Sequence, residues 1–168
     1  MKHGKHLLRL LLIGIVLLLS ACGQAESKQQ AAGQNDEPEA LFKNSEYGIL
    51  VPDSAGWELE EESMKDNLHT TFKNGDIKAI ITSFDTKKTF EQLKTELKAS
   101  SGKVEIIKDE KDKLSFESSL KSSIRTDIIF KKKADYTYIF TFMTPVSKYE
   151  LAEQEITQFI DNVKLNKS

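Results

Sequence analysis

Short polar turns between extended segments restrict the fold of this chain more than any other feature. Asn74-Gly75-Asp76 separates two extended runs, Leu68–Lys73 and Ile77–Phe84, and Asn-Gly favours the two-residue turn of a β-hairpin. The run 77–84 carries apolar residues on both faces, which is typical of a strand inside a sheet. Strands joined by such short turns run antiparallel, because a parallel pair needs a crossover of a dozen or more residues. The sequence therefore predicts a mostly antiparallel sheet.

Further extended segments follow the same spacing and end in polar turns. Taken with the hairpin, they predict a sheet of about 6–8 strands. The additional strands are expected at 47–51, 57–61, 104–107, 114–120, 126–130 and 136–143.

Two segments have the helical period instead. Thr89–Ser100 begins with a T-x-x-Q capping box at Thr89, and Ser147–Val163 begins with an S-x-x-E box at Ser147. Each is amphipathic, with one apolar face formed by Phe90, Leu93 and Leu97 in the first and by Tyr149, Ala152, Ile156, Phe159, Ile160 and Val163 in the second. Both helices need an apolar surface, and the sheet provides one. We therefore expect one α+β domain over residues 41–166, a mostly antiparallel β-sheet packed against two amphipathic α-helices.

The N-terminal segment has the pattern of an export signal. Three basic residues precede an uninterrupted apolar run from Leu10 to Leu19. This run is shorter than the roughly 20 residues of a membrane-spanning helix, so it fits the core of a signal peptide. It ends at Leu19-Ser20-Ala21-Cys22, which resembles the lipobox of bacterial lipoproteins.

The lipobox resemblance implies a cleaved signal peptide over residues 1–21 and a diacylglycerol group on the Cys22 thiol. Leu19, Ser20 and Ala21 would then be the residues that the signal peptidase recognises. The expected location is the cell membrane, with the chain anchored by lipid on the extracytoplasmic face. The alternatives are an uncleaved anchor and a secreted protein whose cysteine is incidental.

Residues 22–40 are predicted to be the lipidated Cys22 and a disordered linker, because Gly23–Ala40 has no aromatic or β-branched residue. Loss of the three basic residues in 1–21 changes the balance from 24 basic and 26 acidic residues to 21 and 26, a formal charge of −5. This balance lacks the positive field that nucleic acid requires. We therefore expect no nucleic-acid partner.

Few residues are available for catalysis or metal binding. The single cysteine excludes a disulfide framework and a thiolate zinc site, and His69 is the only histidine after residue 6. The acidic run at 58–62 lacks the spacing of a calcium-binding loop. We therefore expect no cofactor, no metal site and no enzymatic activity. A hydrolase that uses Ser118, in an S-x-x-K pattern, or His69 is the less favoured hypothesis.

A possible binding surface lies around the last predicted strand. Tyr136, Tyr138, Phe140 and Phe142 share one strand face, and we interpret this face mainly as core beneath the last helix. Tyr136 and Tyr138 lie near the hairpin tip and are expected to be partly exposed beside a basic turn. The possible ligand or partner surface therefore comprises Tyr136, Tyr138, Lys131, Lys132 and Lys133.

The order of these motifs resembles the PsbP/DcrB-like superfamily, whose members often occur as bacterial lipoproteins. The similarity rests on Tyr47-Gly48-Ile49, Val51-Pro52 and Gly56-Trp57 at the start, a helix beginning T-F-E-Q-L-K, and a last helix ending in Phe159–Leu165. It covers roughly Phe42 to Leu165 and implies an antiparallel sheet flanked by helices. For many members it also implies a non-catalytic binding or assembly role.

The leading hypothesis is therefore a membrane-tethered, non-enzymatic module that binds or assembles a protein partner of unknown identity. The alternative is an extracytoplasmic small-ligand receptor with a pocket between the sheet and the last helix.

Overall fold

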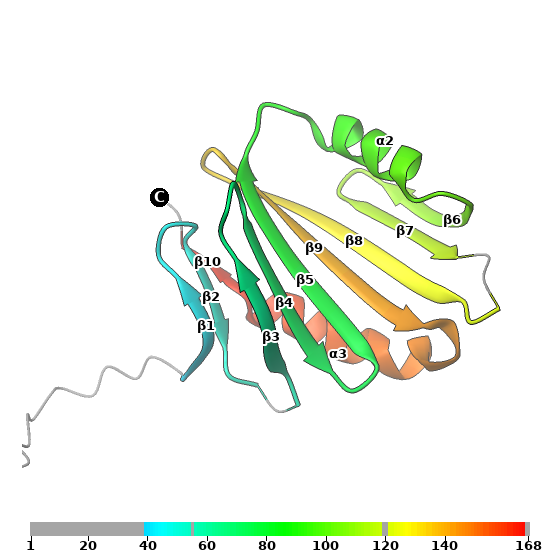
Figure 1. The fold of residues 1–168 in the computed structure, drawn as a ribbon, viewed down its shortest axis with the longest axis horizontal. Helices are drawn as coiled ribbons and strands as arrows, with labels where there is room; N and C mark the ends of the chain where they lie inside the picture. Colours follow the sequence, from blue (N-terminus) through cyan, green and yellow to red (C-terminus); the bar gives the residue numbers. More distant parts are fainter. Residues whose placement is uncertain (1–38, 55, 119–120, 167–168) are drawn as a thin grey trace, which may run out of the picture. The chain divides into compact units, whose positions relative to one another are not determined.

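The computed structural model describes residues 39–54, 56–118 and 121–166. In this part of the chain, two antiparallel sheets and two α-helices form an α+β domain (Figure 1), as predicted. The seven-stranded main sheet has the order β3-β4-β5-β9-β8-β7-β6, and the three-stranded sheet has the order β1-β2-β10. The main-sheet strands are β3 (Glu58–Ser63), β4 (Leu68–Asn74), β5 (Ile77–Asp85), β6 (Val104–Glu110), β7 (Lys113–Ser118), β8 (Ile124–Lys133) and β9 (Tyr136–Pro145). The other elements are β1 (Ala40–Asn44), β2 (Ile49–Pro52), α2 (Phe90–Ser100), the 3-10 turn η1 (Val146–Lys148), α3 (Tyr149–Asn162) and β10 (Lys164–Leu165).

Two strands of the small sheet, β1 and β10, were not expected from the sequence. Both pair with β2, and β10 does so through only two residues, Lys164 opposite Leu50 and Leu165 opposite Ile49. A two-residue strand has no readable period. The pairing of β10 with β2 depends on the position at which the chain leaves α3. The local sequence pattern carries no information about that position.

The predicted Asn-Gly hairpin is confirmed. Asn74 pairs with Ile77 across a two-residue turn, in which Gly75 has a positive φ of 55°. β5 lies between β4 and β9 in the main sheet, as its two apolar faces indicated.

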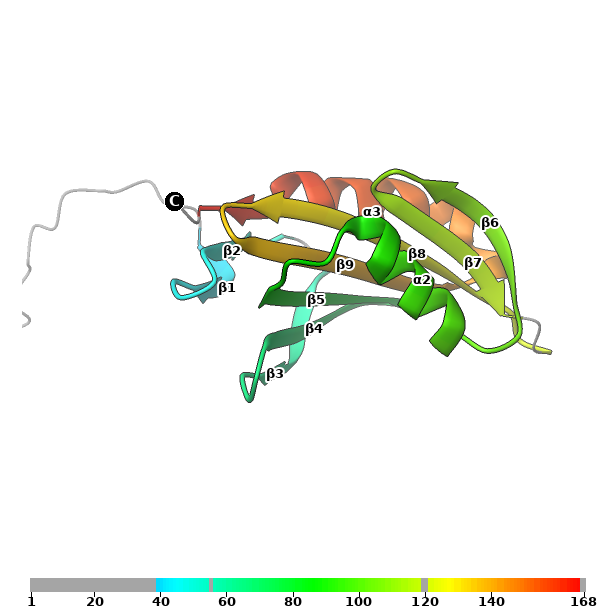
Figure 2. The ribbon, with the colours of Figure 1, turned by 90° about the horizontal axis from the view of Figure 1, so that it is seen from above.

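The two helices cover opposite faces of the main sheet (Figure 2). Since successive residues of a strand point to opposite faces, β9 contributes side chains to the cores on both faces of the sheet. Tyr138, Phe140 and Phe142 belong to the larger core on the α3 side, whereas Ile139 packs in the smaller core on the α2 side. Within the described residues, neither helix is long and apolar enough to cross a membrane.

Helix α2 begins as the capping box predicts. The Thr89 hydroxyl accepts from the Gln92 backbone N–H, and the Gln92 side-chain oxygen accepts from the Thr89 N–H at 2.9 Å. The helix buries Leu93 against β7 and β8, and the Phe90 ring lies 5.4 Å from the Phe130 ring, centroid to centroid.

A buried lysine attaches α2 to β6. The Lys94 side chain is 2% exposed, and its ammonium lies 2.7 Å from Asp109 and 2.6 Å from Glu91. Burial by itself would lower the pKa of Lys94, but these two carboxylates outweigh it and the pKa is raised. Hydrogen bonds from Lys94 and Lys98 lower the pKa of Asp109.

Asp109→Asn is expected to lower the free energy of unfolding at neutral pH and to reduce the loss of stability in acid. The pKa of Asp109 is lowered by folding, so its contribution is complete above the ordinary value of 3.8 and is lost as the pH falls through the folded-state pKa. Urea unfolding of parent and variant at a series of pH values measures this, and the two stability curves should converge in acid. Asp112→Asn, at an exposed position in the β6–β7 turn, is the control. Parallel curves down to the lowest pH would contradict the expected linkage.

Helix α3 starts later than predicted, and the S-x-x-E box at Ser147 is wrong. Ser147 lies inside the 3-10 turn that follows Pro145, and α3 begins at Tyr149 with no side-chain cap. A residue inside a preceding turn does not occupy the N-cap position, so its hydroxyl cannot cap the helix. The predicted apolar face is confirmed, because all of its members pack in the larger core.

Candidate functional site

Tyr138 does not belong to a surface, so the expectation that it is partly exposed is wrong. Its side chain is 0% exposed, and its hydroxyl donates to the Tyr47 carbonyl at 2.7 Å. The β1–β2 turn therefore covers this end of β9. Burial raises the pKa of Tyr138. Tyr136 remains half-buried, with its ring 5.6 Å from the Tyr47 ring, centroid to centroid.

The three lysines of the predicted basic turn lie at the end of β8, and two of them bond to backbone carbonyls of the C-terminal segment, Lys131 in the last turn of α3 and Lys133 in β10. Lys131 donates to the Ile160 carbonyl at 3.4 Å, and Lys133 donates to the Leu165 carbonyl at 2.6 Å. Cations at a helix C-terminus are favourable, because they complement the helix dipole. Lys132 is exposed. The basic turn thus has a structural role in the described domain, and its proposed contact with a ligand or partner remains a prediction.

The residues of the predicted lipidation site, Leu19, Ser20, Ala21 and Cys22, lie outside the described residues. Their assignment stays a prediction from the sequence.

His69 and Ser118 lie far apart in the main sheet. β4, which carries His69, and β7, which carries Ser118, are separated by four strand spacings, or about 19 Å. His69 is exposed with Nδ1 3.4 Å from the Thr82 hydroxyl, and the Ser118 hydroxyl accepts from the Ile124 N–H. The fold does not bring the two candidate hydrolase residues together.

The acidic run forms the exposed edge strand β3. Within residues 39–54, 56–118 and 121–166, no group of three or more acidic, histidine or cysteine side chains is arranged to hold a metal ion.

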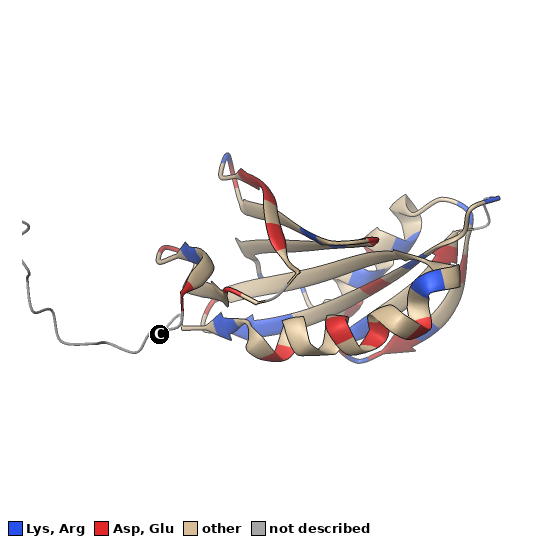
Figure 3. Cartoon of the chain, turned by 90° about the horizontal axis from the view of Figure 1, so that it is seen from below, with Lys and Arg blue, Asp and Glu red and all other residues tan. Residues whose placement is uncertain are grey.

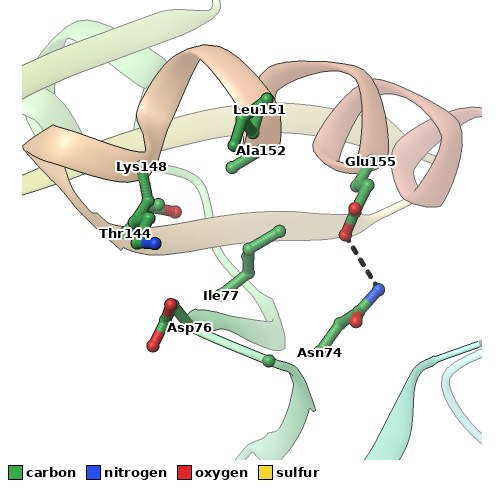
Figure 4. Close-up of a pocket in the computed structure, with 9 residues that line it drawn as sticks. Asn74, Asp76, Ile77, Thr144, Lys148, Leu151, Ala152 and Glu155 are labelled. Atoms are coloured by element: carbon green, nitrogen blue, oxygen red, sulfur yellow. Dashed lines mark hydrogen bonds between the residues drawn. The ribbon is translucent and has the colours of Figure 1, made fainter.

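The structure instead reveals a groove between α3 and the β4–β5 turn. One part, which we call the Thr144 cavity, has a volume of about 230 Å³ (Figure 4). It is lined by Asn74, Gly75, Asp76, Ile77, Thr144, Lys148, Leu151, Ala152 and Glu155. A second part, the Trp57 cavity, has a volume of about 480 Å³ and is lined by Ser54, Gly56, Trp57, Asn74, Glu155, Gln158, Phe159 and Asn162. The two cavities share Asn74 and Glu155, so together they form one groove along α3.

A hydrogen bond divides this groove. The Asn74 side-chain amide donates to a Glu155 carboxylate oxygen at 3.0 Å, which connects the β4–β5 turn to α3. Gly56 provides the space for Asn74, because a Cβ on Gly56 would lie 2.9 Å from the Asn74 side-chain oxygen. Gly56 also has a φ of 88°, a conformation that side chains disfavour.

Gly56→Ala is expected to destabilise the domain by about 1 kcal/mol more than Gly75→Ala. Both positions have positive φ, so both variants strain the backbone by about 1–2 kcal/mol. A Cβ on Gly75 would meet nothing within 4 Å, whereas one on Gly56 would displace the Asn74 amide and break its bond to Glu155. Chemical denaturation followed by circular dichroism measures the difference. Equal losses would show that the Asn74 contact contributes nothing.

A buried polar cluster holds the start of α3 on the sheet. The Asp127 carboxylate, 2% exposed, accepts hydrogen bonds from the Ser115 and Tyr149 hydroxyls. The Lys113 ammonium and the Arg125 Nε lie 3.5 Å and 3.6 Å from its oxygens. Burial and the bond to Asp127 raise the pKa of Tyr149 to about 12. Because Asp127 is surrounded by donors, we interpret this cluster as structural.

Thr144 differs from the other buried polar residues of the domain. In the described residues, five buried side-chain atoms lack a hydrogen-bond partner, in Thr70, Ser83, Arg125, Thr137 and Thr144. Thr144 is 1% exposed and lines a cavity of the groove, whereas the other four line neither cavity. The sequence suggested, as an alternative, a ligand pocket between the sheet and the last helix, but it did not identify these residues, because they come from the β4–β5 turn, the end of β9, η1 and α3. Asn74 and Asp76 were recognised only as turn residues.

The described domain is thus an antiparallel sheet with one helix on each face and a groove beside its last helix. No family model matches the chain, and no curated protein matches it by sequence. Its fold is similar to the solution structure of cyanobacterial PsbP (CyanoP) from Synechocystis sp. PCC 6803, with a TM-score of 0.47, 11% identity, and coverage of 74% of this chain and 90% of that chain. It is also similar to a crystal structure from Bacteroides thetaiotaomicron VPI-5482, with a TM-score of 0.44, 12% identity, and coverage of 78% of this chain and 49% of that chain. Neither likeness assigns an activity or a partner to this chain.

Proposed function

We propose that this protein is a membrane-tethered, non-enzymatic binding module that holds a protein partner at the extracytoplasmic face of a bacterial cell membrane. The observation that carries the proposal is Leu19-Ser20-Ala21-Cys22, which places the only cysteine of the chain directly after a charged start and an apolar run. Each buried lipid CH₂ contributes about 0.8 kcal/mol, and two acyl chains give stable anchoring where one is marginal.

The charge of the processed chain supports a domain that stands away from the lipid. A formal charge of −5 after loss of residues 1–21 is repelled by anionic headgroups. The predicted linker ends where β1 begins at Ala40, one residue earlier than expected, and as a flexible chain from Gly23 to Glu39 it would span roughly 23 Å. A partner could therefore reach the domain beside the membrane.

The exposed side of α3 is the surface that best fits such a partner. The helix carries four acidic residues and no basic one between Tyr149 and Asn162, and these positions appear red in Figure 3. Leu151 lies on the same helix and is 77% exposed. An exposed leucine among carboxylates fits a partner surface with apolar and basic side chains.

Cys22→Ser is expected to abolish lipid labelling of the protein. Cells fed a labelled fatty acid should incorporate it into the parent chain, which should also have lost residues 1–21 by mass. Labelling is the sharper measurement, because an uncleaved apolar segment can keep the variant in the membrane fraction. A Cys22→Ser, Ser27→Cys double variant is the control, since it keeps a thiol but places it after Gln24-Ala25-Glu26, which does not match the lipobox, and it should stay unlabelled. Undiminished labelling of Cys22→Ser would overturn the anchor.

The partner surface is tested separately. Cross-linking in membranes, followed by purification in detergent, should recover a specific protein with the parent chain. The Leu151→Glu variant should no longer recover the cross-linked partner. The Lys132→Glu variant, whose substitution lies at the end of the sheet far from the start of α3, should still recover it. Equal recovery with Leu151→Glu would show that α3 is not the docking surface.

A further inference from the structure

Three polar groups meet at one end of the Thr144 cavity (Figure 4). Thr144 has a buried hydroxyl without a hydrogen-bond partner. Asp76 and Lys148 are exposed at the same cavity, and within the described residues neither is in an ion pair. A carboxylate, an ammonium and a hydroxyl therefore face one space without a protein partner among the described residues.

The rest of the cavity is apolar and has a defined end. Ile77 and Ala152, both buried, and the exposed Leu151 line its middle. The Asn74–Glu155 hydrogen bond closes it on the side away from Thr144 (Figure 4). A ligand that fits would carry both charges at one end and an apolar group at the other.

The volume limits the size of this ligand. A dry protein cavity of about 150 Å³ binds benzene. At the same volume per atom, a cavity of about 230 Å³ accommodates about nine non-hydrogen atoms, which is the size of leucine or isoleucine. Drug-sized ligands occupy pockets of about 300–1,000 Å³, so this cavity, which is open to solvent on one side, holds a smaller molecule.

We propose that the Thr144 cavity binds a free zwitterionic amino acid with an aliphatic side chain. Asp76 would pair with the ligand ammonium, and Lys148 with its carboxylate. The Thr144 hydroxyl would donate to the same carboxylate and so gain its missing partner. The side chain of the ligand would lie against Ile77, Ala152 and Leu151. This inference goes beyond the proposed partner role and does not depend on the lipid anchor.

The ligand class is tested by isothermal titration of the full-length protein, purified in detergent, with four probes. L-Leucine should bind. L-Leucinamide, which lacks the carboxylate, and N-acetyl-L-leucine, which lacks the ammonium, should each bind about tenfold more weakly or worse, because each loses a charge-assisted hydrogen bond. Glycine, which lacks the apolar side chain, should also bind more weakly.

The site is tested with Thr144→Val and a matched control, Thr70→Val. Both variants remove a buried hydroxyl that has no partner, so both should raise the unfolding temperature of the ligand-free protein. Only Thr144→Val should weaken leucine binding, by about threefold or more. Asp76→Asn and Lys148→Gln should weaken it about tenfold. A purely structural Thr144 would change the unfolding temperature but not the dissociation constant for leucine.

Three results would overturn the proposal. These are no binding of leucine at about 10 mM, equal binding of leucine and its two blocked derivatives, and unchanged leucine binding by Thr144→Val. Leu151 lines this cavity as well as the proposed partner surface, so the leucine-binding tests place their site variants only at Thr144, Asp76 and Lys148. Their results leave the Cys22 labelling and the recovery of a partner by the parent chain unaffected, so failure of this site is distinguishable from failure of the proposed function.

Discussion

Phe159→Ala is expected to lower the free energy of unfolding by about 3–5 kcal/mol. The Phe159 ring is 2% exposed and lies at the centre of the larger core. Its centroid is 4.3 Å from that of Trp57, 5.5 Å from that of Phe72 and 5.8 Å from that of Phe142. The substitution removes three ring contacts and leaves a cavity between α3, the main sheet and Trp57. Domains of this kind are stabilised by about 5–15 kcal/mol in total, so the variant should be close to its unfolding threshold.

Far-ultraviolet circular dichroism during urea unfolding is the suitable measurement for Phe159→Ala. Tryptophan fluorescence would change even without unfolding, since the Trp57 ring is in contact with the Phe159 ring. Leu151→Ala is the matched control on the same helix, because Leu151 is 77% exposed and its truncation should change stability by less than about 0.5 kcal/mol. A loss below about 1 kcal/mol for Phe159→Ala would mean that α3 does not pack on the sheet as described.

Asp127→Ala is expected to cost about 3–5 kcal/mol of unfolding free energy. The carboxylate is 2% exposed and accepts from Ser115 and Tyr149. Its removal leaves the buried Ser115 hydroxyl and the half-buried Tyr149 hydroxyl without this acceptor, and leaves the Arg125 guanidinium with Glu117 as its carboxylate partner. Buried polar groups that lose an acceptor are costly. The loss should appear first as fraying of α3 at Tyr149, the first residue of the helix.

Asp127→Asn separates the hydrogen bonds from the charge. The amide keeps one acceptor oxygen, so the variant should be destabilised less than Asp127→Ala. The pKa of Tyr149, raised to about 12 by burial and by Asp127, should fall, which an ultraviolet titration of the tyrosines detects. Asp135→Ala, at an exposed turn between β8 and β9, is the control. Equal stability of Asp127→Ala and the parent would contradict a structural role for the cluster.

The parts of the fold that the sequence predicts correctly are those decided within a few residues. The β4–β5 turn needs only Asn74-Gly75, and the start of α2 needs only Thr89 and Gln92, because each contact joins neighbours in the chain. The S-x-x-E box at Ser147 has the same local pattern but fails. Pro145 is followed by a 3-10 turn that includes Ser147. The predicted start of the helix therefore lies before its observed start at Tyr149.

Exposure was predicted less well, because it depends on distant segments. The alternation of side chains along β9 places Tyr138 on the predicted face of the sheet. The segment that covers its hydroxyl end contains Tyr47, which lies 91 residues earlier in the chain. The lysines after Phe130 look like a free basic patch in the sequence. In the fold, Lys131 bonds to the last turn of α3 and Lys133 to β10, and no local pattern specifies the positions of these two elements.

Features decided by adjacent residues could be predicted directly, namely the antiparallel hairpins and the two amphipathic helices. The export signal and the lipidation of Cys22 depend on adjacent residues in the same way and stay predictions. The groove beside α3, in contrast, is formed by residues that are far apart in the sequence. Asp76, Thr144 and Lys148 share a cavity only because β5 and β9 pair in the main sheet and α3 folds back across it. Side-chain packing over these long separations decides which polar groups are left without partners, and so only the tertiary structure placed a candidate binding site at Thr144.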